Sequence, residues 1–195
     1  MCSLPDCGSG LPGGFWVVQV ARGEVNVIRL CGQKDIDTIC ELINDSACAY
    51  EGHIPDDCYH QPYMPQDELL SEMADGVVFY GYAEDGSLVA VMGIQHRGPV
   101  TLIRHAYTRP EKRREGIGSK LLGHLLGITT KPVMIGTWRG ATWAVMFYQK
   151  HGFKLVGEKD KDRLLREYWS ISPRQIETSV VLVDDRYQQG LYDLG

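Results

Sequence analysis

One loop constrains the fold of this chain more than any other feature. It is the run R-R-E-G-I-G at residues 113–118, which follows an extended apolar stretch and precedes a helical apolar pattern at residues 117–128. A further extended stretch, residues 133–137, comes directly after that helix. A short helical crossover of this kind makes its two flanking strands parallel. We therefore expect an α/β fold built around a parallel pair of strands.

The same loop is suited to holding an anion. Glycines at a strand-to-helix junction let the amides of the first helical turn converge on one point, where the helix dipole also favours negative charge. The run lacks the Lys-Ser/Thr of a P-loop, and its glycine spacing differs from that of a dinucleotide fold. We predict a pyrophosphate-binding loop with a basic, phosphate-attracting rim made by Arg109, Lys112, Arg113 and Arg114.

A second motif lies at residues 147–153, where F-Y-Q-K-H-G-F indicates a helix that ends at His-Gly. Together the two motifs resemble motifs A and B of the GNAT superfamily, the acyl-CoA-dependent N-acetyltransferases. The matching residues, in the family's order and spacing, are Pro110, Arg113, Gly116, Gly118, Ala144, Tyr148, Gly152 and Phe153. One position departs from the pattern, because Ala141 stands where the family usually has an Asn that bonds the pantetheine arm. Thr142 could supply that contact.

The resemblance implies an α/β (α+β) GNAT fold, with about six to seven strands in a mixed central sheet flanked by helices and a splay between the fourth and fifth strands. Residues 1–24 are rich in Gly and Pro and predict a flexible lead-in with a short strand at 15–20. Residues 25–184 form the single acetyltransferase domain, and residues 185–195 form a polar tail. Asp35 is the predicted N-cap of the first helix, and Asp85-Gly86 the predicted turn of a β-hairpin.

Composition argues against several other classes. Twenty basic and twenty-five acidic side chains give a formal net charge of −5, which disfavours nucleic acid or an anionic membrane as partner. No apolar stretch approaches the roughly 20 residues of a membrane span, and no signal peptide is evident, so we expect a cytoplasmic protein. The six cysteines include no C-x-x-C pair, and reduced thiols are expected. A zinc site of Cys48, His53, Cys58 and His60 is conceivable by residue type, but its spacing matches neither a zinc ribbon nor a zinc finger, and no metal is predicted.

The resemblance implies transfer of an acetyl group from acetyl-CoA to a primary amine by direct attack in a ternary complex. Tyr148 matches the family's proton donor, although simple packing beside Ala144 is the alternative. The general base stays open, because the family's glutamate position on the central strand is Leu102 here. Glu51 and His105 are the leading candidates, and His53, His96 and Glu177 are the others.

The remaining site residues fall into two sets. The cofactor set comprises the strand before the loop, the loop itself and two helix residues: His105, Ala106, Tyr107, Thr108, Arg113, Arg114, Glu115, Gly116, Ile117, Gly118, Ser119, Thr142 and Tyr148. The strand should supply backbone partners and an oxyanion donor. The acceptor set combines aromatic walls with one acidic group, which suits an ammonium; it comprises Tyr50, Glu51, Tyr59, Tyr63 and Trp138, with Trp169 a further candidate.

Two further classes of function remain open at this level. A non-catalytic GNAT-fold module could sense acyl-CoA or dock a protein, which the departure at Ala141 fits and the retained Tyr148 opposes. A structural or nucleic-acid-binding domain with an accidental glycine loop conflicts with the acidic charge. For the enzyme, we expect a small-molecule or peptide amine as acceptor and, from the resemblance, a homodimer.

Overall fold

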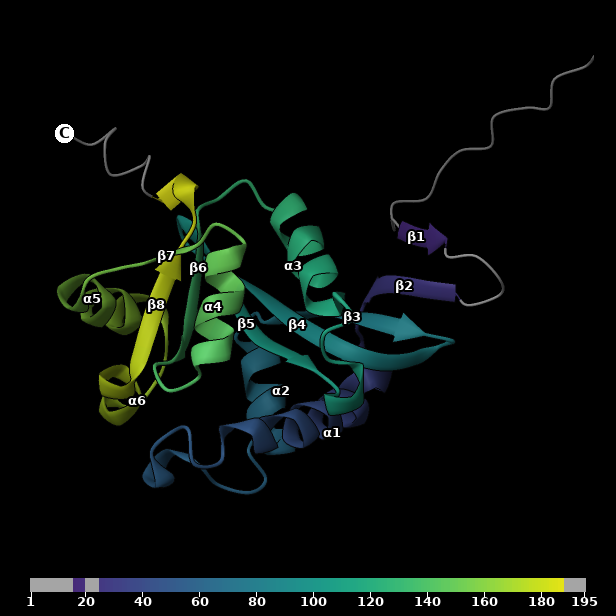
Figure 1. Cartoon of the computed structure of the whole chain (residues 1–195), viewed down its shortest axis with the longest axis horizontal. Coiled ribbons are helices and arrows are strands. Elements are labelled where there is room, and N and C mark those ends of the chain that lie inside the picture. The colour runs from purple at the N-terminus through teal and green to yellow at the C-terminus, as the bar shows by residue number, and fades with distance from the viewer. Residues whose placement is uncertain (1–15, 20–24, 188–195) are drawn as a thin grey trace, which may run out of the picture.

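A single mixed sheet forms the centre of the computed structural model (Figure 1). Among residues 16–19 and 25–187, which the structure describes, eight strands lie in the order β1-β2-β3-β4-β5-β6-β8-β7. The strands are β1 (Trp16–Gln19), β2 (Val25–Leu30), β3 (Val78–Glu84), β4 (Ser87–Arg97), β5 (Val100–Thr108), β6 (Val133–Trp138), β7 (Lys154–Leu155) and β8 (Ser179–Val183). The expected fold is confirmed, with β1 and the two-residue β7 bringing the number of strands above the six to seven predicted.

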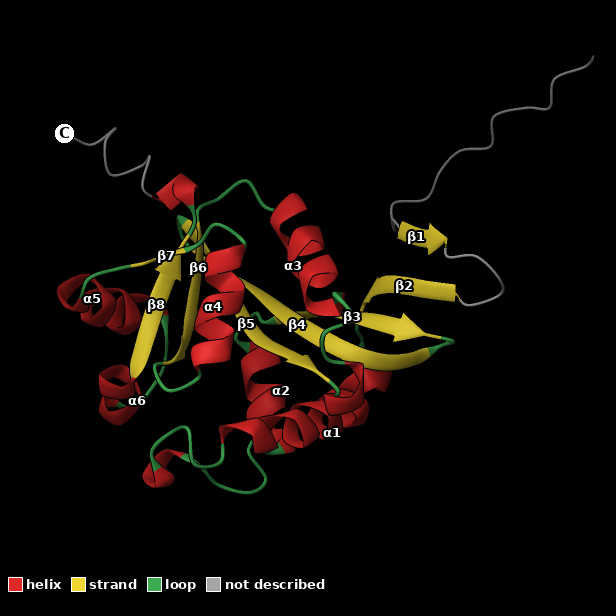
Figure 2. Cartoon of the chain, viewed as in Figure 1, coloured by secondary structure: helices red, strands yellow, loops and turns green. Residues whose placement is uncertain are grey.

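Helices cover both faces of this sheet (Figure 2). One face carries α3 (Ile117–Gly127) and α4 (Thr142–Lys150), and the core beneath them includes Ile103, Leu121 and Ile135. The opposite face is divided. Over its first half lie α1 (Ile36–Ala47) and α2 (Gln66–Ala74), and over its second half lie α5 (Glu158–Tyr168) and α6 (Pro173–Thr178). Most of the sheet is therefore covered on both sides.

The parallel pair predicted from the crossover is β5 and β6, and these strands separate early. Their pairing extends only from Thr101 with Val133 to Ile103 with Ile135. Beyond this point β5 continues to Thr108 and β6 to Trp138 without further pairing between them. Counted from β2, these are the fourth and fifth strands, so the predicted splay is confirmed.

A β-bulge in β5 lies at the mouth of the splay. On β4, Val91 pairs with Tyr107 and Gly93 pairs with Arg104, so that Met92 faces two residues of β5. One of these two is His105, whose φ of 50° is unusual for a residue with a side chain. A bulge disrupts the hydrogen-bonded ladder and bends its strand. Here it directs the end of β5 away from β6.

Most local predictions are confirmed, and one capping role is wrong. The turn at Asp85 and Gly86 has positive φ at both residues, as the hairpin requires. Asp35 stands directly before α1 but does not cap it. Its carboxylate instead accepts two hydrogen bonds from Arg29, at 2.7 and 2.8 Å, and one from the amide of Gly32. The carboxylate binds Arg29 on β2 and not the first amides of α1, because a bidentate ion pair is stronger than a single N-cap hydrogen bond. Helix α6 was not predicted.

The predicted lead-in and tail lie largely outside the described residues. Of residues 1–24, the structure describes only β1, which agrees with the predicted strand at 15–20. Of residues 185–195, it describes 185–187. In the described part of the chain, no helix is both long and apolar enough to cross a membrane.

Candidate active site

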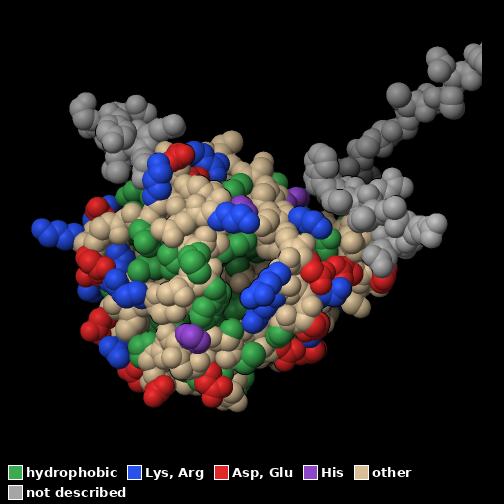
Figure 3. Space-filling view, in the orientation of Figure 1, with side chains coloured by type: hydrophobic (Ala, Val, Ile, Leu, Met, Phe, Trp, Pro, Cys, Tyr) green, Lys and Arg blue, Asp and Glu red, His purple; other side chains and the backbone are tan. Residues whose placement is uncertain are grey.

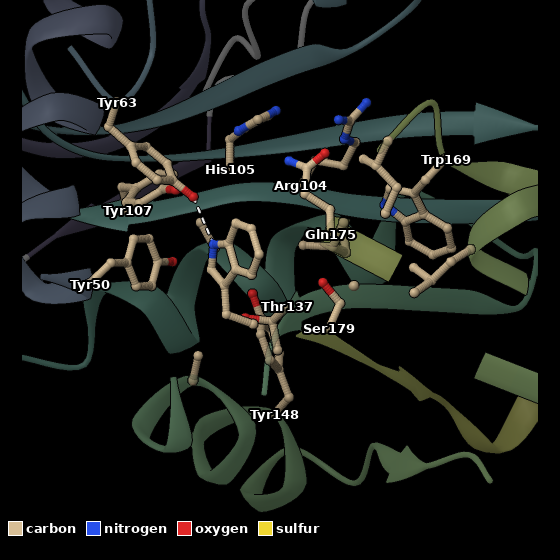
Figure 4. A pocket seen from close by; sticks show the side chains of 17 residues that line it. Tyr50, Tyr63, Arg104, His105, Tyr107, Thr137, Tyr148, Trp169, Gln175 and Ser179 are labelled. Carbon is tan, nitrogen blue, oxygen red and sulfur yellow. Dashed lines mark hydrogen bonds between the residues drawn. The ribbon is translucent and has the colours of Figure 1, made fainter. Parts of the chain in front are cut away.

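The splay between β5 and β6 opens a cleft whose walls come from both layers of helices (Figure 4). On the α3/α4 side it is lined by Ala106, Ala144 and Tyr148, which belong to the core beneath those helices. On the opposite side it is lined by Tyr107 and Trp169, which pack with α1/α2 and α5/α6 respectively. The cleft therefore passes through the sheet, and two molecules could meet in it from opposite faces.

Tyr148 stands on the α3/α4 side of this cleft. It is 5% exposed, and its ring packs edge-on against Phe147 and Phe153. Burial raises the pKa of the Tyr148 phenol above its ordinary value. The group therefore stays protonated at neutral pH and can donate a hydrogen bond. Tyr148 also packs in the same cluster as Ala144, and this packing is compatible with a role as proton donor.

Phenols and an indole surround the mouth of the cleft. The Nε1–H of Trp138 donates to the phenol oxygen of Tyr63 at 2.8 Å, and the Tyr50 ring lies 5.4 Å from the Tyr63 ring. Burial raises the pKa of Tyr63 and of Tyr107, which keeps both phenols neutral. None of the residues lining the cleft is Asp or Glu. Four residues of the predicted acceptor wall or strand thus come together: Tyr50, Tyr63, Tyr107 and Trp138.

The glycine loop has the geometry of an anion site at the start of α3. Gly116 takes the left-handed conformation, with φ of 78°, directly before the helix, and no side chain caps the first turn. The amides of Ile117, Gly118 and Ser119 consequently lack helical partners and point along the helix dipole. Phe147 of α4 packs beside this turn, where a Cβ at Gly118 would meet its ring at an ordinary contact distance of 3.5 Å. Figure 3 shows an apolar hollow on this face with Lys and Arg side chains along one side.

Three of the four side chains of the predicted basic rim are bound to neighbouring groups, and the attraction of phosphate by this rim stays a prediction. Arg109 pairs with Glu41 and Asp45. Lys112 pairs with Glu84, and Arg113 donates to the backbone oxygen of Ser46 at 3.0 Å. Only Arg114 shows no such partner in the described part of the chain. The cations of the other three hold the loop to α1 and β3.

Of the two leading base candidates, neither projects into the cleft. Glu51 is exposed and is not one of the lining residues. His105 lines the cleft, but its side chain extends from β5 away from Tyr148 (Figure 4). Its ring contacts Phe79, and its Nε2 bonds the carboxylate of Glu72 on α2. No sequence pattern singles out Glu72, since it is one of several acidic residues on that helix.

The other candidates lie elsewhere. His53 is exposed beside Trp143, His96 bonds Thr101 through Nδ1, and Glu177 forms an exposed pair with Arg174. Tyr59 lines a separate hollow beside Tyr63. The four residues of the conceivable zinc set form no cluster: among the described residues, no group of three or more His, Cys, Asp or Glu side chains could hold a metal ion.

Motif B departs from the family pattern for a visible reason. Ala141 is fully buried, with Ile54 and Trp138 around it. An amide side chain at this position would have to displace that apolar cluster. Thr142 is exposed at the start of α4, where a contact to a bound molecule stays a prediction.

Residues 75–155 match the family model described as the acetyltransferase (GNAT) domain. This segment of the chain is therefore similar to a GNAT domain. That match covers the bulged strand, the glycine loop, α3, β6 and α4, whereas Tyr50, Tyr63 and Trp169 of the cleft lie outside it. No curated protein sequence matches the chain.

Solved structures agree on the fold. An acetyltransferase from Streptococcus agalactiae 2603 is 16% identical, with a TM-score of 0.63 over 82% of this chain and 97% of that one. The PaiA N-acetyltransferase from Thermoplasma acidophilum, in complex with coenzyme A, is 19% identical, with a TM-score of 0.62 over 82% and 98%. The ribosomal-protein-S18-alanine N-acetyltransferase from Escherichia coli is 12% identical, with a TM-score of 0.56 over 82% and 92%.

Proposed function

We propose that this protein is an N-acetyltransferase that transfers an acetyl group from acetyl-CoA to a primary amine by direct attack, with both substrates bound. The observation that carries the proposal is the cleft through the sheet, with Tyr148 on one side of it and an aromatic wall on the other. Two reactants entering from opposite faces would be held in contact, which converts a bimolecular reaction into an effectively unimolecular one.

The residues of the α3/α4 side suit coenzyme A. The uncapped amides of Ile117, Gly118 and Ser119 offer donors for its pyrophosphate, and the apolar hollow beside them suits its pantetheine arm. When bound, acetyl-CoA supplies an activated acyl group as a thioester. The bulge at His105 and Ala106 interrupts the ladder of β5, and a backbone amide released there can stabilise the carbonyl oxygen as it gains negative charge.

Tyr148 serves as the proton donor to the departing sulfur. A phenol with a raised pKa is a weak acid, so its proton moves only as the thiolate forms, and the phenol recovers a proton from the attacking nitrogen or from solvent. No carboxylate lines the cleft, and both leading base candidates lie outside it or face away. We therefore propose that the amine loses its proton to solvent before it attacks.

The acceptor side suits a small amine. Trp169 lies against Gly136 of β6, where an added Cβ would come within 3.2 Å of the indole. The indole thus occupies the space beside β6 and shortens the cleft on this side. Aromatic faces of Tyr50, Tyr63 and Trp138 offer cation–π contacts to a second positive group on the acceptor. A homodimer and a cytoplasmic location stay predictions.

Calorimetric titration with acetyl-CoA, compared with ADP, followed by a thiol-release assay across a panel of amines, tests the proposal. We expect binding that favours acetyl-CoA and thiol release that depends on an amine. Binding without release for any amine would favour a module that senses acyl-CoA or docks a protein, which the buried Ala141 also fits. Absence of binding to either nucleotide would overturn the assignment of the cofactor site.

A further inference from the structure

One acidic side chain outside the cleft contacts two adjacent residues of the bulged strand. Glu72, on α2, receives Arg104 on Oε1 at 2.7 Å and His105 Nε2 on Oε2. All three side chains are largely buried, at 18% exposed for Glu72 and 12% for each of the other two. A single carboxylate thus binds the two side chains that flank the first peptide bond of the bulge.

The backbone at this point needs such support. His105 has φ of 50°, in the left-handed region that costs free energy for a residue with a Cβ. A conformation of this kind persists only where surrounding contacts over-determine it. The Phe79 ring beneath the imidazole and the Glu72 carboxylate beside it are the contacts that do so.

A second set of bonds anchors Arg104 from the other direction. Its Nη1 donates to Oε1 of Gln95 at 3.2 Å, and Gln95, which is 1% exposed, donates to the backbone oxygen of Asp75 at 2.9 Å. Asp75 follows the last residue of α2. Arg104 is therefore bonded to this helix twice, directly through Glu72 and indirectly through Gln95 and Asp75. Helix α2 is thereby tied to the bulge through buried polar bonds.

We infer that Glu72 is a positioning residue for acetyl transfer: it holds the bulge of β5 in the conformation that presents its backbone to the reacting carbonyl. The inference rests on the proposed function, and it assigns the His105 ring to a structural role in place of proton abstraction. Burial alone would raise the pKa of Glu72, but the hydrogen bond from His105 and the charge of Arg104 lower it, which keeps the carboxylate ionised at neutral pH.

The first test is Glu72→Gln, with Glu68→Gln as the matched control. Glu68 lies one turn earlier on α2 and is exposed, so its replacement removes the same charge without breaking a hydrogen bond to Arg104 or His105. We expect Glu72→Gln to lower kcat about 10- to 100-fold, since a small displacement of a reacting group has effects of this size. Its Kd for acetyl-CoA should stay near that of the native protein, because the glycine loop holds the pyrophosphate elsewhere.

Hydrogen exchange gives a readout that needs no turnover. Amides of residues 102–108 should exchange faster in Glu72→Gln than in Glu68→Gln, while those of α3 should not differ. Equal exchange and equal kcat in the two variants would overturn the inference while leaving the proposed function intact. Failure of the native protein to bind acetyl-CoA would instead overturn the proposed function.

Substitutions at position 105 separate a backbone role from a base. Gly and Asn tolerate left-handed φ, Ala tolerates it less, and a β-branched Val least. If the bulge conformation matters, kcat should be highest for His105→Gly and His105→Asn, lower for His105→Ala and lowest for His105→Val. Equal and complete loss of kcat in all four variants, with hydrogen exchange at residues 102–108 unchanged, would show that the imidazole is needed for the chemistry and would overturn the structural role.

Discussion

The indole N–H of Trp138 donates a hydrogen bond to the phenol oxygen of Tyr63 over 2.8 Å, joining residues 75 positions apart in the chain. Trp138 ends β6, whereas Tyr63 belongs to the irregular segment between α1 and α2. This bond closes the aromatic wall of the cleft by tying a loop to a strand of the sheet.

Tyr63→Phe should destabilise the protein by about 1–3 kcal/mol, because the N–H of a tryptophan that is only 9% exposed loses its acceptor. Unfolding in urea measures the change. Tyr59→Phe is the control: its hydroxyl accepts one exposed bond from Gln61, and we expect a change within about 0.5 kcal/mol. Equal stability of the two variants would mean that the Trp138 bond contributes nothing measurable.

Gly140→Ala should lower the melting temperature. An added Cβ would lie 1.8 Å from the backbone oxygen of His53, so the turn before α4 or the loop that carries Tyr50 must move. Strain of this kind costs about 1–3 kcal/mol. Gly123→Ala makes the matched comparison: nothing lies within 4 Å of its added Cβ in α3, and alanine there should stabilise by about 1 kcal/mol. A shift of the same sign in both variants would contradict the tight packing at Gly140.

Tyr148→Phe should reduce kcat for acetyl transfer by about 100-fold or more while leaving the Kd for acetyl-CoA unchanged, because it removes a proton donor but preserves the ring packing. Steady-state kinetics and calorimetry give the two values. Tyr187→Phe, at the opposite end of β8 from the cleft, should retain native kcat. Full turnover by Tyr148→Phe would exclude this residue as the acid.

The pH dependence of kcat/KM should follow the acceptor. If the amine loses its proton to solvent, log kcat/KM rises with a slope of about one per pH unit up to the amine's own pKa. For two acceptor amines with different pKa values, log kcat/KM should then reach its plateau at two different pH values. A plateau at one shared pH would indicate a protein group acting as base, contrary to the proposal.

Asp35→Asn should cost about 2 kcal/mol of stability at pH 7. The hydrogen bonds from Arg29 lower the pKa of Asp35 to about 2, below its usual 3.8, and each pKa unit corresponds to about 1.4 kcal/mol. A lowered pKa stabilises the fold above the unfolded value, and this contribution is lost as the pH falls from about 4 towards 2. Urea unfolding at pH 7, 5, 4 and 3.5 should therefore show the gap between native and variant narrowing only below pH 4. Asp37→Asn, exposed in the same helical turn, should show no such convergence.

Local sequence information predicted the elements and the two motifs of the cleft. The hairpin turn at Asp85-Gly86, the start of α3 after the glycine loop and the end of α4 before His151-Gly152 depend on conformational preferences of a few adjacent residues, and each is found where it was expected. The splay and the presence of Tyr148 beside it came from the family resemblance, because spacing alone does not reveal where two strands part.

Contacts between distant residues decided the rest. Asp35 was predicted to cap α1, but it pairs with Arg29 on β2 because the fold brings a guanidinium within 2.7 Å. Two cations of the expected basic rim, Arg109 and Lys112, pair with carboxylates of α1 and β3, which approach the loop only in the folded chain. Glu72 carried no sequence signal, as its role requires the bulge 33 positions later to present His105 to it. These contacts join residues that are far apart in the sequence and close in space, so they depend on the tertiary structure and not on the local sequence.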